Sequence, residues 1–382
     1  MKNSYHSLAF PIHKISLPEK FNRVILGLGS HSKNTLCLAK GRFAYLSEPL
    51  SDLGVLRDLL CFEKRVFAMR KIKPKIIAFD LHPGYQSTKF ARKIQAEGYR
   101  MVPVQHHHAH IASCMADNGL KNQKVIGVAF DGTGLGVDNQ LWGGDFLLCD
   151  YRSFSRKAHL KEIALVGGER AILEPGRLAL SWLSSIYKEN LPDLKIAFIK
   201  YAKNKKWRVL ERMRSLNINS PLSSSMGRLF DAAASLILAK YKAGIEAELA
   251  IKLEQAAKRC KLPLKAYKFN IYEERGAYLI DPAPLFKGLV RDLQDKVTRE
   301  SMAYKFHLTV AKIILEACRI LRKEHRIKKV VLSGGVFQNN LLLSLCSGLL
   351  YKEGFQVLSH KKLSPNDSGI SLGQVMIANY RV

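Results

Sequence analysis

Three segments of the chain share one pattern, an apolar and β-branched run that ends in a glycine-rich polar turn. They begin at Val24, Val125 and Val330. A continuous apolar run that ends in glycines predicts a buried strand feeding a tight turn. Residues 76–80 form a fourth run, which passes into Leu-His-Pro-Gly, a turn signal. The pattern therefore predicts buried strands whose turns let backbone amides approach a ligand.

Helical patterns lie between these strands. Residues 301–324 carry apolar side chains at helical spacing, and the Ala- and Leu-rich residues 228–258 are equally typical of helix. Strands and helices in this order predict an α/β protein. The recurring glycine turns predict two related lobes around a cleft. We expect an N-terminal lobe over residues 22–120 and a C-terminal lobe over residues 121–382, with a helical insertion near residues 175–260.

Composition narrows the class of protein. The 382 residues are 47% hydrophobic and 24% charged, which argues against a disordered chain. No run approaches the ~18 apolar residues of a membrane span, and the N-terminal sequence has no apolar signal region. Seven cysteines without a CxxC pair argue against a disulfide framework and a thiolate zinc site. We expect a cytoplasmic protein, without a membrane partner, whose thiols are mostly buried.

Charge is the one abnormal quantity. The chain has 61 Lys and Arg against 32 Asp and Glu, a formal net charge of +29. Such a balance favours anionic partners such as nucleic acid, nucleotide phosphates or an acidic protein surface. Lysines spread over an ordinary surface by a compositional bias are an equally good explanation. The charge alone does not decide between the two.

The most specific motif is a histidine run, Gln105-His-His-His-Ala-His110. On a helix, His106 and His110 stand at i and i+4, with Cβ atoms roughly 5–6 Å apart on one face. Two imidazoles at this spacing can hold one metal ion, with further positions left for carboxylate or substrate oxygen. His107 and His108 would then point to other faces. The alternative is a polar helix start with surface histidines.

Two carboxylates are candidates to complete such a site. Asp131 follows a buried strand directly, and Asp367 lies in a Pro-Asn-Asp-Ser-Gly turn before another apolar run. Carboxylate oxygen is a suitable companion to imidazole on zinc or iron. Aspartate is also common in turns, where it caps backbone amides. Spacing alone leaves both interpretations open.

Glycine-rich turns suggest a nucleotide cleft. In Asp131-Gly-Thr-Gly, the amides around Gly132, Thr133 and Gly134 can converge on a phosphate, with the Thr133 hydroxyl as a further donor. Gly334 and Gly335, with Gln338 and Asn339 just beyond, could wrap an adenosine. The segment Ser-Met-Gly-Arg-Leu-Phe-Asp, which contains Gly227 and ends at Asp231, adds a third element. Neither a P-loop nor a dinucleotide-binding GxGxxG unit is found.

Together these motifs resemble the carbamoyltransferase part of the HypF family, which matures hydrogenases. The resemblance rests on motifs that occur in this order: QHHHAHIASCMA, VAFDGTGLGVDNQLWGGDF, SSSMGRLFDAAA, LSGGVFQNNLL and SPNDSGISLGQ. It covers roughly residues 22–378. This part of HypF is similar to the tRNA-modifying TsaD and to antibiotic O-carbamoyltransferases. The resemblance implies two ribonuclease-H-like lobes of the actin/Hsp70/sugar-kinase (ASKHA) superfamily, with nucleotide between them.

The resemblance also implies a reaction and its residues. A carbamoyl group would pass from carbamoyl-adenylate, made with ATP, to the C-terminal cysteine of HypE, and would later become the cyanide ligand of NiFe-hydrogenase. One zinc or iron ion would act as a Lewis acid. Metal and catalytic roles would fall to one set of four residues: His106, His110, Asp131 and Asp367. The adenylate would contact Gly132, Thr133, Gly134, Gly227, Gly334, Gly335 and Asn339, and its ribose Asp231.

The chain departs from the family pattern in several respects, two of which bear on its function. HypF proteins carry acylphosphatase-like, zinc-binding and YrdC-like domains before this part, so we expect a separate YrdC-type protein to supply carbamoyl-adenylate here. A glycine of the family is replaced by Ala247. The alternatives are a TsaD-like transferase acting on tRNA, an O-carbamoyltransferase acting on a small-molecule hydroxyl, and a non-catalytic nucleotide-binding scaffold. The net charge supports tRNA, whereas the motif details favour HypF.

Overall fold

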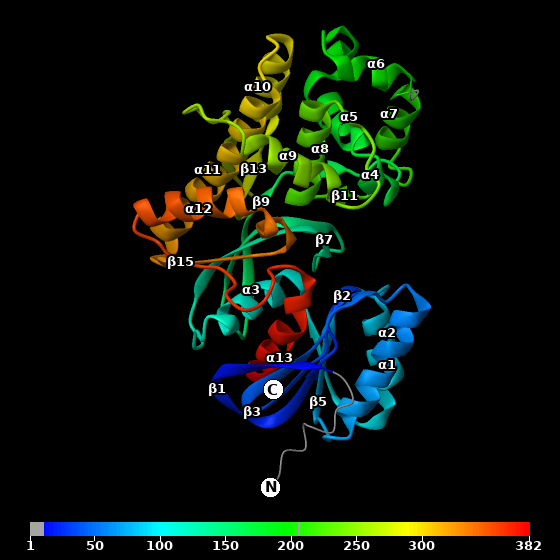
Figure 1. Cartoon of the computed structure of the whole chain (residues 1–382), viewed down its shortest axis with the longest axis vertical. Coiled ribbons are helices and arrows are strands. Elements are labelled where there is room, and N and C mark those ends of the chain that lie inside the picture. The colour runs from blue at the N-terminus through cyan, green and yellow to red at the C-terminus, as the bar shows by residue number, and fades with distance from the viewer. Residues whose placement is uncertain (1–10, 205–206) are drawn as a thin grey trace.

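Two β-sheets, each covered by helices, organise the computed structural model, which describes residues 11–204 and 207–382 (Figure 1). The first sheet has the strand order β3 (Cys37–Ser47), β1 (Ile12–Gly27), β5 (Ile76–Asp80) and β6 (Arg100–Val104). The β1 strand pairs antiparallel with β3 and parallel with β5, and β5 pairs parallel with β6. A short ribbon joins β2 (Ser32–Asn34) to β4 (Leu50–Asp52).

The second sheet is larger and mixed. Its main path runs β12 (Asn270–Glu274), β13 (Ala277–Asp281), β9 (Phe154–Leu160), β8 (Leu141–Cys149), β7 (Val125–Leu135), β14 (Lys329–Ser333) and β15 (Gln356–Leu358). The short strands β10 (Ile163–Ala164) and β11 (Leu222–Ser223) join beside β8. The β14 strand runs parallel to β7, so both end at the same edge of the sheet.

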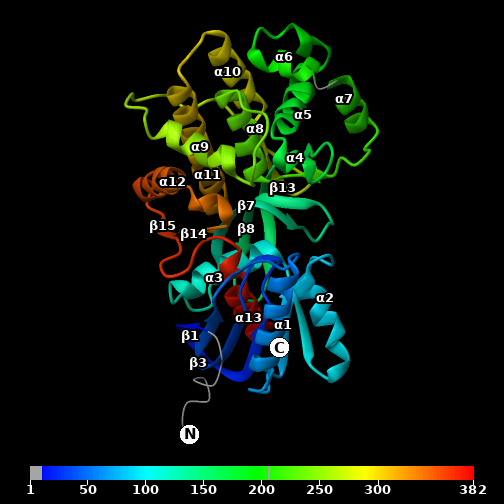
Figure 2. The ribbon, with the colours of Figure 1, turned by 45° about the vertical axis from the view of Figure 1, so that its right-hand side comes forward.

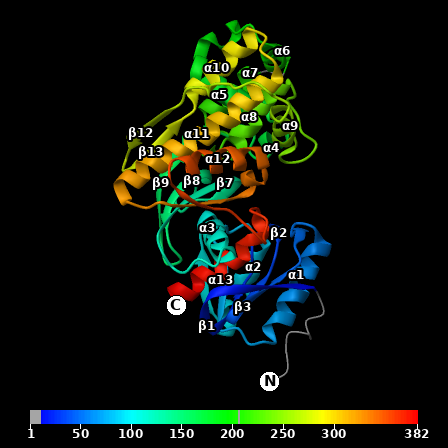
Figure 3. The same ribbon diagram turned by 60° about the vertical axis from the view of Figure 1, so that its left-hand side comes forward.

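Helices form three layers around the two sheets. The first sheet is covered on one face by α1 (Leu56–Arg70) and α2 (Gln86–Lys93). Between the sheets lie α3 (His106–Asp117) and α13 (Ile370–Arg381), whose buried side chains share one core with both sheets (Figure 2). The other helices belong to the region beyond the second sheet (Figure 3): α4 (Arg170–Leu173), α5 (Gly176–Tyr187), α6 (Ala197–Asn204), α7 (Trp207–Ser215), α8 (Met226–Leu238), α9 (Glu248–Ala257), α10 (Ala283–Gln294), α11 (Arg299–His325) and α12 (Asn340–Lys352).

The strands expected from the apolar runs are present as β1, β5, β7 and β14, and the helix expected over residues 301–324 is α11. The last helix, α13, packs against the first sheet although it lies within residues 121–382, the range expected for the C-terminal lobe. All seven cysteines are free, and five of them are buried, as expected. Within the described residues, no helix is both long and apolar enough to cross a membrane. Residues 1–10, which contributed to the expectation of no signal sequence, lie outside the described part.

Residues 228–258 do not form the uninterrupted helical stretch that their composition suggests. They are divided between α8 and α9, because Ala239 and Ala247 both adopt left-handed backbone angles, with φ of 51° and 62°. Alanine is the best helix former, so its presence gave no signal of a break. In the left-handed region its Cβ crowds the following carbonyl oxygen, at a cost of roughly 1–2 kcal/mol.

We predict that Ala247→Gly stabilises the protein. Relief of the left-handed strain outweighs the larger backbone entropy of glycine in the unfolded chain, and the net gain is up to about 1 kcal/mol. Denaturant unfolding of the two proteins measures the difference. As a matched control, Ala250→Gly within α9 should lower the free energy of unfolding by about 1 kcal/mol. Equal destabilisation by both substitutions would contradict the prediction.

Candidate metal centre and adenylate turns

The histidine run folds as the first turns of α3, as its spacing predicted. Gln105 caps the helix, since its side-chain oxygen accepts a hydrogen bond from the backbone N–H of His108 at 2.8 Å. His106 and His110 therefore lie one turn apart on the same face, with ring centroids 4.9 Å apart. Both side chains are buried.

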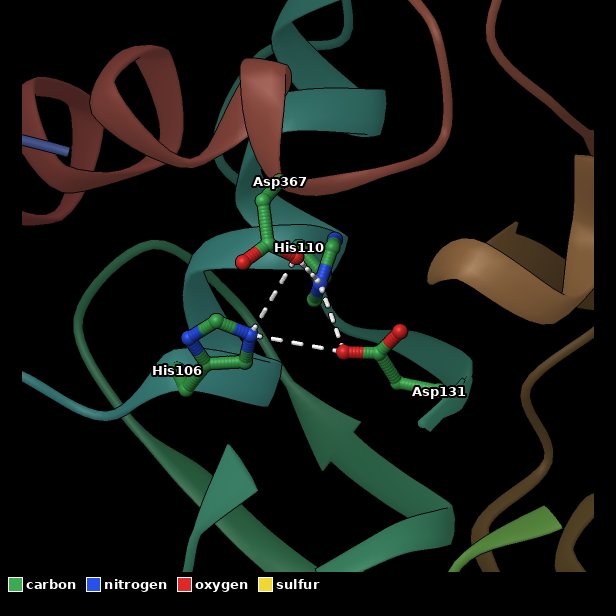
Figure 4. Close-up of side chains that lie close together, drawn as sticks. All are labelled: His106, His110, Asp131 and Asp367. Carbon is green, nitrogen blue, oxygen red and sulfur yellow. Dashed lines mark ion pairs between the residues drawn. The ribbon is translucent and has the colours of Figure 1, made fainter. Parts of the chain in front are cut away.

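The structure brings Asp131 and Asp367 to these two histidines (Figure 4). Asp131 Oδ2 lies 3.4 Å from Nε2 of both His106 and His110. Asp367 Oδ1 lies 3.7 Å from His106 Nε2 and 3.5 Å from His110 Nε2. Asp131 comes from β7 of the second sheet, and Asp367 from the turn that precedes α13. We refer to these four residues as the His-Asp cluster.

The cluster fits a divalent metal ion. Ligand atoms about 2.1 Å from a tetrahedral metal are separated by about 3.4 Å, close to the four histidine–aspartate distances. Nε2 of His106 and Nε2 of His110 are buried and have no hydrogen-bond partner among the described residues. Buried polar atoms are normally satisfied, so this pair of nitrogens indicates a ligand. Two imidazoles and two carboxylates suit zinc or iron.

The carboxylate of Asp80, which is outside the His-Asp cluster, orients the ring of His106. Asp80, at the end of β5, accepts a hydrogen bond from His106 Nδ1 at 2.8 Å. This contact places the proton of the neutral ring on Nδ1 and leaves Nε2 free to bind a metal. The sequence predicted Asp80 only as the end of a strand. A carboxylate at a strand end before a turn was the available signal, but it did not indicate the partner on α3.

The opposite charges of the histidines and aspartates in the His-Asp cluster shift one another's pKa values. Burial acts to lower the pKa of His106, but the carboxylates of Asp367 and Asp80 outweigh it and hold the pKa well above its usual value. The pKa of His110 is also raised, because Asp131 and Asp367 overcome the effect of burial. Burial would raise the pKa of both cluster aspartates, yet the two imidazoles hold each pKa below its usual range. Protons therefore compete with a metal ion for the imidazoles.

The glycine turns converge on Asp131. Backbone N–H of Gly335 donates to Asp131 Oδ1 at 2.9 Å. Gly334 has a φ of 104°, and a Cβ there would lie 2.2 Å from the carbonyl oxygen of Phe130, so only glycine lets β14 approach β7 in this way. A Cβ on Gly227, near the start of α8, would lie 2.9 Å from Gly132 Cα. The three glycine segments predicted for adenylate thus lie side by side, although the first lies within strand β7 and Gly227 lies within helix α8.

The remaining residues predicted for adenylate differ in their surroundings. Thr133 and Gly134 lie within strand β7 and not in the turn that the sequence predicted, next to an irregularity in the pairing of β7 with β8, and Thr133 is half-buried. Asn339 caps α12: its side chain accepts from the N–H of Leu342 at 2.9 Å and lies 2.9 Å from His307 Nε2. The hydrogen-bonding groups of Asn339 are therefore already engaged within the chain.

Asp231 lies on α8 in a buried polar group that the sequence did not fully reveal. Its Oδ2 forms an ion pair at 3.3 Å with Arg228 Nη2, whose hydrogen bond goes to Glu246 at 2.9 Å. Burial raises the pKa of Asp231 to about 6, although Arg228 opposes the shift. Asp231 Oδ2 accepts no hydrogen bond within the described residues. Arg228 stands inside the motif that contains Gly227, and this neighbourhood was the only sequence signal for it.

Comparisons with known proteins match nearly the whole chain. A family model described as "HypF Kae1-like domain" matches residues 20–117, and one described as "Carbamoyltransferase, Kae1-like Domain, second subdomain" matches residues 127–374. Carbamoyltransferase HypF of Synechocystis is 33% identical over 95% of this chain and 48% of its own length. A carbamoyltransferase HypF homolog of Cupriavidus necator is 31% identical over 93% of this chain and 91% of its own.

A solved structure supports the same family assignment. The crystal structure of a full-length HypF in its phosphate- and nucleotide-bound form superposes with a TM-score of 0.88 and 37% sequence identity, over 96% of this chain and 57% of that one. The fold is of the α/β class, as predicted, and it is shared with this HypF structure. The chain belongs to the HypF carbamoyltransferase family. It spans about half the length of the Synechocystis relative.

We predict that the purified protein binds a single divalent ion and that His106→Ala and His110→Ala each lose it. Each substitution removes one buried ligand atom, and a three-ligand remnant with an unpaired carboxylate holds the ion far less tightly. Elemental analysis after dialysis measures the metal content. His13→Ala, which alters an exposed histidine, should retain it. Full metal content in both cluster variants would contradict the assignment.

We predict that metal affinity falls as the solution is acidified. Both cluster imidazoles have raised pKa values, so protons occupy them at pH values where free histidine is already neutral. On acidification from about pH 8 to about pH 6, the dissociation constant should rise, with a limiting slope of about tenfold per pH unit for each proton displaced below the pKa of that imidazole. Titration with a competing chelator at several pH values measures this. A constant affinity over that range would contradict the prediction.

Proposed function

We propose that this chain is a metal-dependent transferase that moves a carbamoyl group from carbamoyl-adenylate to the C-terminal cysteine of a HypE-like acceptor protein. In this proposal the thiocarboxamide so formed becomes the cyanide ligand of a NiFe-hydrogenase. One observation carries the proposal: the His-Asp cluster and the three glycine segments meet at Asp131. A metal site and an adenylate site that share one residue favour chemistry on the acyl-phosphate bond.

The cluster residues would hold the zinc or iron ion, which supplies Lewis-acid stabilisation of negative charge when bound. Asp80 keeps His106 in the tautomer that binds. Asp131 would bind the ion through Oδ2, while its Oδ1 accepts from the N–H of Gly335, so the same carboxylate connects the segment after β14 to the cluster. The amides around Gly132, Gly134, Gly334 and Gly335 would receive the phosphate.

The reaction balances without a further reagent. The thiolate sulfur of the acceptor cysteine forms a bond to the carbamoyl carbon, and the bond from that carbon to the phosphate oxygen breaks. AMP leaves with the bonding electron pair, and the proton of the thiol has passed to solvent. The buried Asp231, with an oxygen that accepts no bond within the described residues, would bind the ribose hydroxyls. We propose that a YrdC-type activity, which makes carbamoyl-adenylate with ATP, supplies the substrate.

The acceptor is the least constrained part of the proposal. The net charge of +29 is a specific observation in favour of an RNA acceptor, because contacts to phosphates dominate nucleic-acid affinity. A small-molecule hydroxyl is a further alternative acceptor. A scaffold that binds nucleotide without transfer is the alternative outside enzymes.

We predict transfer of radiolabelled carbamoyl to a HypE-like protein when the metal-loaded chain is given carbamoyl-adenylate from a YrdC-type enzyme. The label should be absent from an acceptor whose C-terminal cysteine is replaced by serine. Asp131→Asn should lower the rate by at least about a hundredfold, since it weakens both the cluster and the hydrogen bond to Gly335. Labelled tRNA or a labelled small alcohol would instead identify that acceptor. Nucleotide binding without any labelled product would favour the scaffold.

A further inference from the structure

His107 has no role in the proposals above, although it stands between the cluster residue His106 and the rest of the histidine run. Its ring is fully buried and lies on another face of α3, where its centroid is 5.4 Å from that of His106 and 6.5 Å from that of His110. It is not among the four residues of the His-Asp cluster. Its hydrogen bonds determine which nitrogen carries the proton.

Gln105 fixes the tautomer of His107. The side-chain oxygen of Gln105 accepts from the backbone N–H of His108 at 2.8 Å, and its Nε2 donates to the carbonyl oxygen of Leu135 at 3.1 Å. These two backbone contacts leave only one orientation for the amide. The same Nε2 lies 3.1 Å from His107 Nδ1 and is a donor, so Nδ1 must accept. The ring is therefore neutral and carries its proton on Nε2.

The ring is also held in place by its neighbours. It stacks on Trp142, with centroids 6.2 Å apart and planes 30° apart. The indole N–H of Trp142 donates to Asp138 at 2.9 Å, and the guanidinium of Arg156 lies 4.1 Å from the indole centroid. The direction of the Nε2–H bond of His107 is thus set before any ligand binds.

This donor has no acceptor. His107 Nε2 is buried and makes no hydrogen bond within residues 11–204 and 207–382. A Cβ on Gly134 would lie 2.9 Å from it and 2.9 Å from His106 Cδ2, so the nitrogen lies beneath strand β7 at Gly134, at the edge of the His-Asp cluster. A buried N–H without an acceptor is costly, and native proteins retain few of them.

We propose that His107 is a substrate-binding residue whose Nε2–H donates to an oxygen at the acyl-phosphate end of carbamoyl-adenylate. The inference rests on the proposed function and assigns a donor beside the metal centre. A neutral donor with a preset direction stabilises charge that grows on that oxygen as the carbamoyl carbon is attacked. Gln105 is then a positioning residue, because it acts on substrate only through the tautomer of His107.

The test compares two substitutions that differ in one property. His107→Phe keeps an aromatic ring against Trp142 but removes the donor, whereas His107→Gln can present an amide N–H near the position of Nε2. Metal content and thermal unfolding of both variants are measured first. Affinities for adenosine and AMP, and the rate of carbamoyl transfer, follow by calorimetry and the radiolabel assay.

We expect His107→Phe to bind adenosine normally and to lose about ten- to hundredfold in AMP affinity or in transfer rate. A loss in AMP affinity assigns the phosphoryl oxygen, and a loss in rate alone assigns the carbamoyl oxygen. His107→Gln should recover most of the loss. Wild-type behaviour of His107→Phe in both assays would overturn the inference, while a wild-type protein that binds neither adenosine nor AMP would overturn the proposed function as well.

A measurement on the unaltered protein guards against misfolded variants. Nitrogen NMR of protein labelled in histidine distinguishes the two neutral tautomers. We expect His107 to carry its proton on Nε2, and the Nε2–H signal to shift when AMP or carbamoyl-adenylate is added. A ring protonated on Nδ1 would overturn the inference whatever the variants do.

Discussion

The position of α3 between the two sheets is the constraint on which the site depends. One helix presents His106 and His110, and each sheet contributes a carboxylate: Asp80 from the end of β5 and Asp131 from within β7. Asp367 approaches from the turn before α13, which packs beside α3. A shift of the second sheet relative to α3 would therefore change a distance within the His-Asp cluster, and a shift of the first sheet would change the contact of Asp80 with His106.

Burial of so many charges is tolerated because they are balanced. An isolated carboxylate in a protein interior is very unfavourable, and removing one partner of a buried ion pair typically costs about 3–5 kcal/mol. Here two imidazoles with raised pKa values face two carboxylates with lowered ones. The same donor set fits a divalent cation. The arrangement that would hold a metal ion therefore also lowers the free-energy cost of burying its ligands.

The sequence predicted the parts of the site that depend on local geometry. The i and i+4 spacing of His106 and His110 follows from helix periodicity alone. Asp131 and Asp367 were ambiguous, because an aspartate in a turn has the same sequence signature whether it caps an amide or binds a metal. The structure brings both to the histidines. Asp80 was missed as a functional residue, since its partner lies on another element 26 residues away.

Other structural features could not be predicted from local sequence patterns, for different reasons. The break between α8 and α9 occurs at alanines, which carry no turn signal. The buried pair of Arg228 and Asp231 depends on which surfaces the fold closes, and so does the unsatisfied nitrogen of His107. Tertiary packing decides such contacts, and a single sequence does not encode them as a period or a motif.

The place of α13 has a consequence for how the protein is made. The core between the sheets contains side chains of β1 and β5, which are translated early, and of α13, which follows Asp367. On the ribosome the first sheet therefore waits for residues translated some 290 positions after β5 before its inner face is completely covered. Until then α3 is available to cover that apolar face but α13 is not, and the His-Asp cluster lacks Asp367. Completion of this core and completion of the cluster therefore depend on the same last stretch of the chain.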